Sequence, residues 1–190
     1  WGGSKVVKMF MENSATLSIY LKELDKKGQT ALHWACEWGN SYVVKMFIYS
    51  LTTLGIDINT RDNAGQTAFH LACRYGHNNV VKLFMEYSAT FRIQFNTKDN
   101  EGQTALYLAC KWGHSVGHRH VVNMLMDNAA TLGIDFNIKD NAGQTPLHLA
   151  CRWGLFKIVK LFLEKSAILS IDFNTKDNAG LTAFHVACTW

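Results

Sequence analysis

One segment recurs five times along this 190-residue chain, and that repetition limits the possible folds more than any other feature. The segment DNAGQTAFHLACRYGH begins at Asp62, and close copies begin at Asp25, Asp99, Asp140 and Asp177. The four spacings between these aspartates are 37, 37, 41 and 37 residues. A fixed period of this size is typical of proteins that stack one supersecondary unit many times. The sequence therefore predicts an array of similar units that share one continuous core.

Each unit carries signals for two helices after a polar turn. In the second copy the first helix is expected over residues 67–75, because Thr67 is a good N-cap and Gly76 suits the position just after a helix. Pro146 begins the same helix in the fourth copy, where proline is well tolerated. The second helix has apolar residues at three- and four-residue spacing. We expect it to run through residues 88–90 into an extended segment.

These first helices resemble the T-P-L-H-x-A helix of ankyrin repeats. Their sequences here are TALHWA, TAFHLA, TALYLA, TPLHLA and TAFHVA, and the resemblance covers essentially the whole chain. It implies an all-α ankyrin-repeat solenoid, in which stacked helix-turn-helix units are joined by β-turn or hairpin loops. The chain departs from the family pattern in three ways. Alanine replaces the proline in four copies, Tyr107 replaces one histidine, and each unit is longer by about one helical turn.

The repeat register predicts a single solenoid domain over residues 1–190. Whole repeats are expected at 25–61, 62–98, 99–139 and 140–176, with partial repeats at 1–24 and 177–190. The third repeat carries a four-residue insertion, SVGH, at 115–118. Trp1 and Trp190 both match the interior of a unit, and apolar residues lie at both ends, where solenoids need polar caps. We therefore expect the chain to be an excerpt of a longer array.

The cysteines occupy the same place in each unit, at Cys36, Cys73, Cys110, Cys151 and Cys188. Equivalent positions in a stack lie too far apart to form disulfides, so these residues are expected to be small buried hydrophobes. Free buried thiols indicate a reducing, intracellular and cytoplasmic setting. No apolar segment approaches the roughly 20 residues that cross a bilayer, so no membrane segment is expected.

The histidines raise the question of catalysis. Four of them lie three residues before a cysteine, one per unit: His33, His70, His148 and His185. Catalysis needs one pocket with a nucleophile, a base and an orienting group, and near-copies of one pattern do not provide it. We therefore expect no enzyme activity, no catalytic residue and no cofactor. The resemblance implies instead that each histidine hydrogen-bonds the neighbouring turn.

A second group of histidines, His114, His118 and His120, surrounds the insertion. Three histidines within seven residues suit a transition metal, but no cysteine or carboxylate ligand is adjacent. A solvated loop is the preferred interpretation, and no metal site is expected. Because the insertion breaks the regularity of the array, a contact with a partner also stays open for it.

Before the glycine that follows the first helix of a unit, the sequence places a mostly basic residue and then an aromatic one. The pairs are Glu37-Trp38, Arg74-Tyr75, Lys111-Trp112 and Arg152-Trp153. The resemblance implies that these pairs, here called the ladder, face the concave groove of the solenoid. Tryptophan, tyrosine and arginine dominate binding hot spots, but large aromatic residues also pack well between units. Both roles stay open for the ladder.

The turn tips are the second contact surface that the resemblance implies. Their residues are Asn63, Gln66, Asn100, Glu101, Gln103, Asn141 and Gln144. Together with the ladder they predict a non-catalytic scaffold for protein–protein interaction. The tips are nearly the same in every unit, which favours an extended or repetitive partner, or recent duplication without tuning.

Asparagines also form a column before each turn, at Asn59, Asn96, Asn137 and Asn174. Side-chain amides that bridge successive loops are the simpler interpretation. The resemblance also implies enzymatic hydroxylation at Asn59, Asn137 and Asn174, each of which follows an Asp-x pair.

Two other functions stay open at this point. Uncapped ends and near-identical units could stack end to end, which would make the chain a self-associating structural array. Aromatic residues interleaved with basic ones also suit single-stranded nucleic acid. However, the net charge of +4 is modest and aspartates line the turns, so nucleic acid is the least favoured partner.

Overall fold

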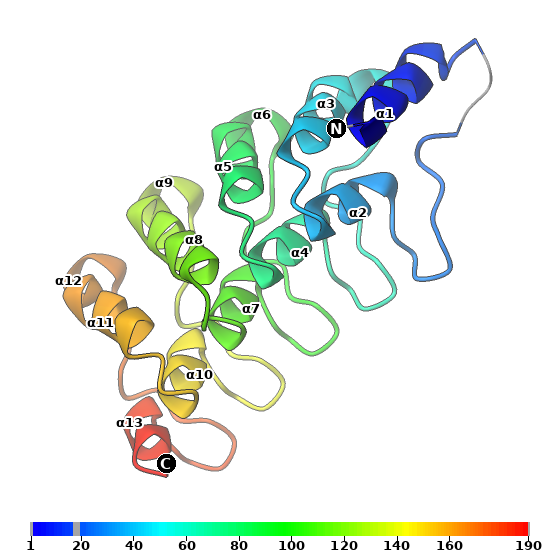
Figure 1. Ribbon diagram of the computed structural model, residues 1–190. Helices are drawn as coiled ribbons and strands as arrows, with labels where there is room; N and C mark the ends of the chain where they lie inside the picture. The colour runs from blue at the N-terminus through cyan, green and yellow to red at the C-terminus, as the bar shows by residue number, and fades with distance from the viewer. Residues whose placement is uncertain (1, 17–19, 190) are drawn as a thin grey trace.

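The structure, a computed structural model, describes residues 2–16 and 20–189, which form two rows of helices joined by turns (Figure 1). Trp1 and Trp190, which set the expected register of the ends, lie outside the described residues. The inner row holds α2 (Ala31–Glu37), α4 (Ala68–Arg74), α7 (Ala105–Lys111), α10 (Pro146–Arg152) and α13 (Ala183–Ala187). The outer row holds α1 (Gly2–Asn13), α3 (Ser41–Leu54), α5 (Asn78–Glu86), α8 (Val116–Asp127) and α11 (Phe156–Glu164). Three short helices follow outer ones: α6 (Ser88–Phe91), α9 (Ala129–Leu132) and α12 (Ser166–Leu169).

The two rows build one continuous core. Each inner helix packs against the next inner helix, and each outer helix packs against the next outer one. Buried apolar residues form a single cluster that extends from Leu32 to Ala183. Within the described part of the chain, β-structure is limited to two isolated bridges, Arg61 with Thr67 and Lys176 with Thr182. The expected all-α solenoid of stacked helix-turn-helix units is therefore confirmed.

The inner helices begin and end where local sequence signals predict. In α4 the Thr67 Oγ1 accepts a hydrogen bond from the His70 N–H at 3.4 Å, and the His70 Nδ1 accepts one from the Thr67 N–H at 3.1 Å. This reciprocal arrangement is a capping box. After the helix, Gly76 has a φ of 70°, and the His77 N–H donates to the Ala72 carbonyl at 3.0 Å. A Schellman motif thus ends the helix.

Three outer helices, α5, α8 and α11, are separated by one residue from the short helix that follows, so the expected continuous helix through residues 88–90 is wrong. The outer helix α3 is continuous over its 14 residues. α5 ends at Glu86, and Tyr87 separates it from α6 with a φ of −100°. α6 ends at Phe91, and the next residue, Arg92, has a left-handed φ of 49°. Ser170 takes the same conformation after α12. Glycine holds this place in two other units, where the left-handed conformation has no steric cost. This reversal directs the chain back toward the next turn.

The insertion at 115–118 is not a solvated loop, and that prediction is also wrong. It forms the first turn of α8, which has 12 residues where α5 and α11 have nine. The Ser115 Oγ caps this turn by accepting a hydrogen bond from the His118 N–H at 3.3 Å. The His118 imidazole is buried, and its Nε2 donates to the Arg74 carbonyl of the preceding unit at 2.7 Å. The insertion therefore lengthens an outer helix and ties two units together.

The cysteines follow the expected pattern only in part. Cys36, Cys73 and Cys110 are fully buried, Cys151 is half-buried and Cys188 is exposed. Burial raises the pKa of the first three thiols, which keeps them neutral. Cys188 is the C-cap residue of α13. All five cysteines are free thiols.

Candidate functional site

The turns that flank the inner helices are held by a repeated set of hydrogen bonds. In the second unit the Asp62 Oδ1 accepts hydrogen bonds from the Ala64 and Gln66 N–H groups, at 2.9 and 2.8 Å. The same two bonds recur at the four other turn aspartates. Each carboxylate therefore closes its own turn and fixes the conformation of the tip.

The tip asparagines join one turn to the next. The Asn100 Nδ2 donates to the Asn63 carbonyl at 2.9 Å, and the Asn100 N–H donates to the Ala64 carbonyl at 3.0 Å. Asn63 and Asn141 make the same pair of bonds to the turns before them. These asparagines are exposed, but their amides already bond within the array. The tips are therefore rigid and regularly spaced.

The glutamines Gln66, Gln103 and Gln144 do not lie on the tip surface to which they were assigned. Their exposed fractions are only 7%, 5% and 7%. The Gln66 Nε2 donates to the Asp99 Oδ2 of the next unit at 3.0 Å, and the Gln144 Nε2 donates to the Asp177 Oδ2 at 3.3 Å. Gln66 and Gln144 thus connect successive units behind the tips, because the second oxygen of each turn carboxylate is available to them.

The third unit departs from this pattern because of Tyr107. The Tyr107 hydroxyl donates to the Asp140 Oδ2, the atom that a glutamine would otherwise use. Gln103 instead donates to the Glu101 Oε2 at 2.8 Å, and the Lys111 ammonium lies 3.8 Å from the same oxygen. One substitution thus moves Gln103 toward an exposed charged pair. The sequence showed the tyrosine, but only the structure shows this rearrangement.

The repeated histidines have the structural role that the resemblance implied. The His33 Nε2 donates to the Gln66 carbonyl at 3.1 Å, and the His70 Nε2 donates to the Thr97 carbonyl at 2.9 Å. His148 makes the corresponding bond to the Leu181 carbonyl at 3.1 Å. The Nδ1 of each ring is used in the helix cap, so both nitrogens are engaged within the array. Burial lowers the pKa of His33 and His70, which favours the neutral rings that these bonds require.

Acidification is expected to destabilise the chain through His33 and His70. Because the folded-state pKa of both rings lies below the usual value of about 6.5, the unfolded chain takes up protons at a higher pH than the folded chain. The contribution of these two rings to the free energy of unfolding is therefore fully present above about pH 6.5, and it decreases as the pH falls below that value. Thermal unfolding between pH 7 and pH 5 should show a falling Tm. The variant H33Y/H70Y, which copies the natural Tyr107, should show a weaker pH dependence, and an equal slope in both proteins would contradict this origin.

The aromatic residues of the ladder lie at the ends of successive inner helices and remain open to solvent. Trp38, Tyr75, Trp112 and Trp153 each follow the last residue of an inner helix. Their exposed fractions are 74%, 43%, 47% and 50%. The neighbouring unit therefore covers only part of each ring, and a row of aromatic surface stays available along the array.

The charged members of the ladder have different surroundings. The Arg74 guanidinium lies 5.8 Å from the Tyr75 ring and 5.6 Å from the Trp112 ring, so one cation bridges two units. Glu37 accepts a hydrogen bond from the Tyr75 hydroxyl at 3.3 Å. Lys111 is paired with Glu101, and Arg152 is half-buried beside Trp153. The ladder thus both connects units and presents surface, so the two roles considered for it are compatible.

The asparagine column bridges loops. The Asn59 Nδ2 donates to the Arg92 carbonyl at 3.3 Å, and its Oδ1 accepts from the Gln94 N–H at 3.1 Å. Asn96 and Asn137 make the same two bonds to the loops that follow them. These bonds support the structural interpretation. Hydroxylation of Asn59, Asn137 and Asn174 stays a prediction.

The histidines around the insertion do not form a cluster. His118 is buried against the preceding unit, whereas His114 and His120 are exposed. Across residues 2–16 and 20–189, no three histidine, cysteine or acidic side chains gather closely enough to hold a metal ion. No helix in the same ranges is both long and apolar enough to cross a bilayer.

Comparison with protein families adds one clear result. A profile described as "Ankyrin repeats (3 copies)" matches residues 2–62, 48–140 and 116–190, which together span almost the whole chain. A comparison with curated proteins gave no match. Because the family profile covers far more than half of the sequence, and the stacked units have the geometry described above, the chain belongs to the ankyrin-repeat family.

Proposed function

We propose that this chain is a non-catalytic module that binds another protein along the ladder and the exposed turn tips. Ankyrin repeats are generally protein–protein interaction modules, and the family is typically non-catalytic. The observation that carries the proposal is the row of four exposed aromatic side chains at the ends of successive inner helices. Exposed aromatic surface beside arginine is the composition of binding hot spots.

The ladder suits binding because it is held in place before any partner arrives. Each aromatic residue follows a short capped helix, and the tips beside it are joined by hydrogen bonds from turn to turn. A preorganised surface loses little conformational entropy on association, so more of its contact energy contributes to affinity. The same rigidity favours an extended partner that contacts several units in succession.

The charged residues of the ladder indicate which kind of protein segment it would attract. Arg74, Lys111 and Arg152 lie beside the aromatic rings in three successive units, whereas Glu37 holds that position in the first. An acidic segment would therefore be attracted to the later units of the ladder. The three fully buried free thiols suit an intracellular setting for this interaction.

The proposal can be tested by charge reversal on the ladder. Peptides selected from a displayed random library against the wild-type chain should bind the variant R74E/K111E/R152E at least about tenfold more weakly, because like charges then face an acidic peptide. Fluorescence polarisation with the selected peptides measures the affinities, and circular dichroism checks that the variant is folded.

The matched control is K5E/K45E/K82E, which makes the same change in charge on α1, α3 and α5 of the outer row. It should retain the wild-type affinity. Equal weakening in the two variants would mean that net charge, not the ladder, determines binding. Selection of no peptide above background would contradict the proposed function.

A further inference from the structure

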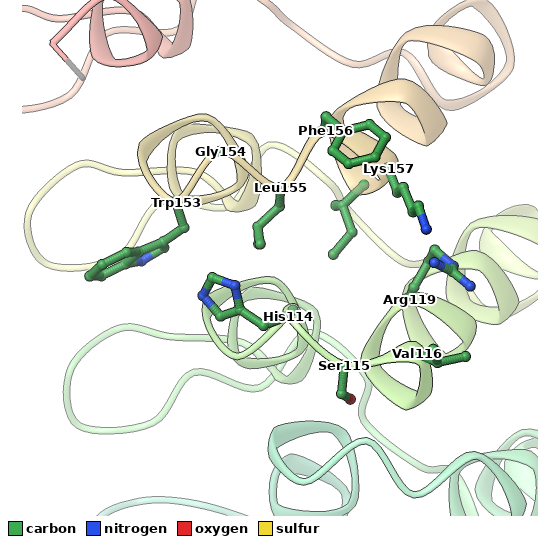
Figure 2. Close-up of a pocket in the computed structure, with 11 residues that line it drawn as sticks. His114, Ser115, Val116, Arg119, Trp153, Gly154, Leu155, Phe156 and Lys157 are labelled. Carbon is green, nitrogen blue, oxygen red and sulfur yellow. The ribbon is translucent and has the colours of Figure 1, made fainter.

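A pocket of about 280 Å³ lies between the third and fourth units, where the inner helices lead into the outer ones. One wall comes from the link between α7 and α8 and from the extra first turn of α8. The other wall comes from residues 153–158, which connect α10 to α11 (Figure 2). The insertion in the third unit therefore helps to build this pocket.

The equivalent places between earlier units are occupied by imidazole rings. Between the first and second units, the His77 Nε2 donates to the Glu37 carbonyl at 2.8 Å. Between the second and third, the inserted His118 makes the corresponding bond to the Arg74 carbonyl. In the fourth unit this position is Leu155, which has no side-chain hydrogen-bond donor. The fourth unit therefore places the side chain of Leu155, and no imidazole, next to Gly113 of the third unit.

The insertion also changes the role of His114. His114 corresponds to His77, because each directly follows the glycine after an inner helix. However, it is His118 that makes the hydrogen bond to the preceding unit. His114 instead faces the fourth unit, where its ring centroid lies 6.4 Å from that of Trp153 in an edge-to-face arrangement. These two rings form an aromatic end of the pocket (Figure 2). The buried Leu155 and Ile158 provide an apolar lining.

The other end of the pocket is cationic. Arg119 on α8 and Lys157 on α11 converge there from the two walls (Figure 2). Neither has a carboxylate within salt-bridge distance in the part of the chain that the structure describes. By contrast, the outer-helix residues Lys82 and Lys160 are each paired with a glutamate four residues later. Two converging cations without a counter-charge favour an anionic group between them.

We propose that this pocket binds an acidic peptide segment of a protein partner through one carboxylate and one neighbouring aromatic side chain. The carboxylate lies between Arg119 and Lys157, and the aromatic side chain packs against Trp153 and His114. The volume is close to the lower limit of about 300 Å³ for ligand pockets, which suits one or two side chains. This inference rests on the proposed function, since it specifies the sequence character of the partner at the end of the ladder.

NMR titration of the full chain with two short peptides tests the inference. The probes are acetyl-Gly-Phe-Glu-Gly-amide and its neutral counterpart acetyl-Gly-Phe-Gln-Gly-amide. The Phe-Glu peptide should shift the amide resonances of Arg119 and Lys157 and the indole resonance of Trp153. The Phe-Gln peptide should bind about tenfold more weakly, because it lacks the charge-assisted hydrogen bonds.

Two variants assign the effect to the pocket. The variant R119Q/K157Q should bind the Phe-Glu peptide about tenfold more weakly than the wild-type chain. The control K5Q/K45Q, which makes the same change in charge on α1 and α3, should keep the wild-type affinity. Equal binding of the two peptides, shifts confined to other units, or no binding of the Phe-Glu peptide would each overturn the inference. The proposed function would still stand if library peptides bind the wild-type ladder and lose affinity for R74E/K111E/R152E, so the two failures are distinguishable.

Discussion

Replacing Phe84 by alanine is expected to lower the free energy of unfolding by about 3–5 kcal/mol, the range for a large aromatic residue removed from a core. Phe84 on α5 is fully buried. Its ring centroid lies 5.4 Å from that of Phe69 on α4, and Phe69 lies 5.0 Å from Phe95. The substitution therefore leaves a cavity at the contact between an inner helix, an outer helix and the following loop. Urea unfolding followed by circular dichroism measures the loss.

The matched control is F184A, because the chain has a phenylalanine on α13 that is 75% exposed. That substitution should change the free energy of unfolding by less than about 0.5 kcal/mol. In a stacked array each unit contacts only its neighbours, so F84A should also lower the amide protection of the second and third units more than that of the fourth. A loss of similar size in both variants would contradict the assignment of Phe84 to the core.

The elements that could be predicted from the sequence are those determined by local signals. α4 was expected at residues 67–75 and occupies Ala68–Arg74, with Thr67 as its cap and Gly76 after its end. Both signals act within one turn of the helix, so they do not depend on the rest of the structure. The fixed period then extends the same prediction to the other inner helices.

The insertion shows where the local interpretation was incomplete. Ser115 and His118 have the same spacing as Thr67 and His70, so the cap signal of the inner helices was already present in the inserted residues. The Ser115 Oγ and the His118 Nδ1 lie 2.6 Å apart, as in an inner-helix cap. A loop was expected because the insertion contains the flexible Gly117. The same pattern would have predicted an added helical turn.

The contacts that differ from one unit to the next could not be predicted, because they join residues that are more than 30 positions apart. The bond of each turn glutamine depends on whether a carboxylate oxygen of the next unit is free to accept it. In one unit the Tyr107 hydroxyl already occupies that oxygen, so Gln103 bonds to Glu101 instead. Similarly, the pocket beside Trp153 depends on two different residues, His118 and Leu155, at structurally related places. Such differences between near-identical units are visible only when the units are stacked.

Replacing Asp99 by alanine is expected to lower the free energy of unfolding by about 3 kcal/mol, because it leaves several buried donors without an acceptor. Asp99 is only 7% exposed. Its Oδ1 accepts hydrogen bonds from the Glu101 and Gln103 N–H groups, at 3.0 and 2.8 Å. Its Oδ2 accepts the bond from Gln66 of the preceding unit at 3.0 Å. The substitution thus removes both the closure of one turn and the connection to the unit before it.

Two further variants separate these contributions. D57A removes an exposed aspartate whose Oδ1 accepts one hydrogen bond, from the Asn59 N–H at 2.9 Å. It should lower the free energy of unfolding by no more than about 1 kcal/mol. D99N keeps an acceptor for the turn but presents an amide donor to Gln66, so its loss should lie between those of D57A and D99A. Urea unfolding of the three variants gives the comparison. If D99A lowers the free energy of unfolding no more than D57A does, the turn carboxylates do not connect the units, and the regular spacing of the tips must come from the tip asparagines and the helices.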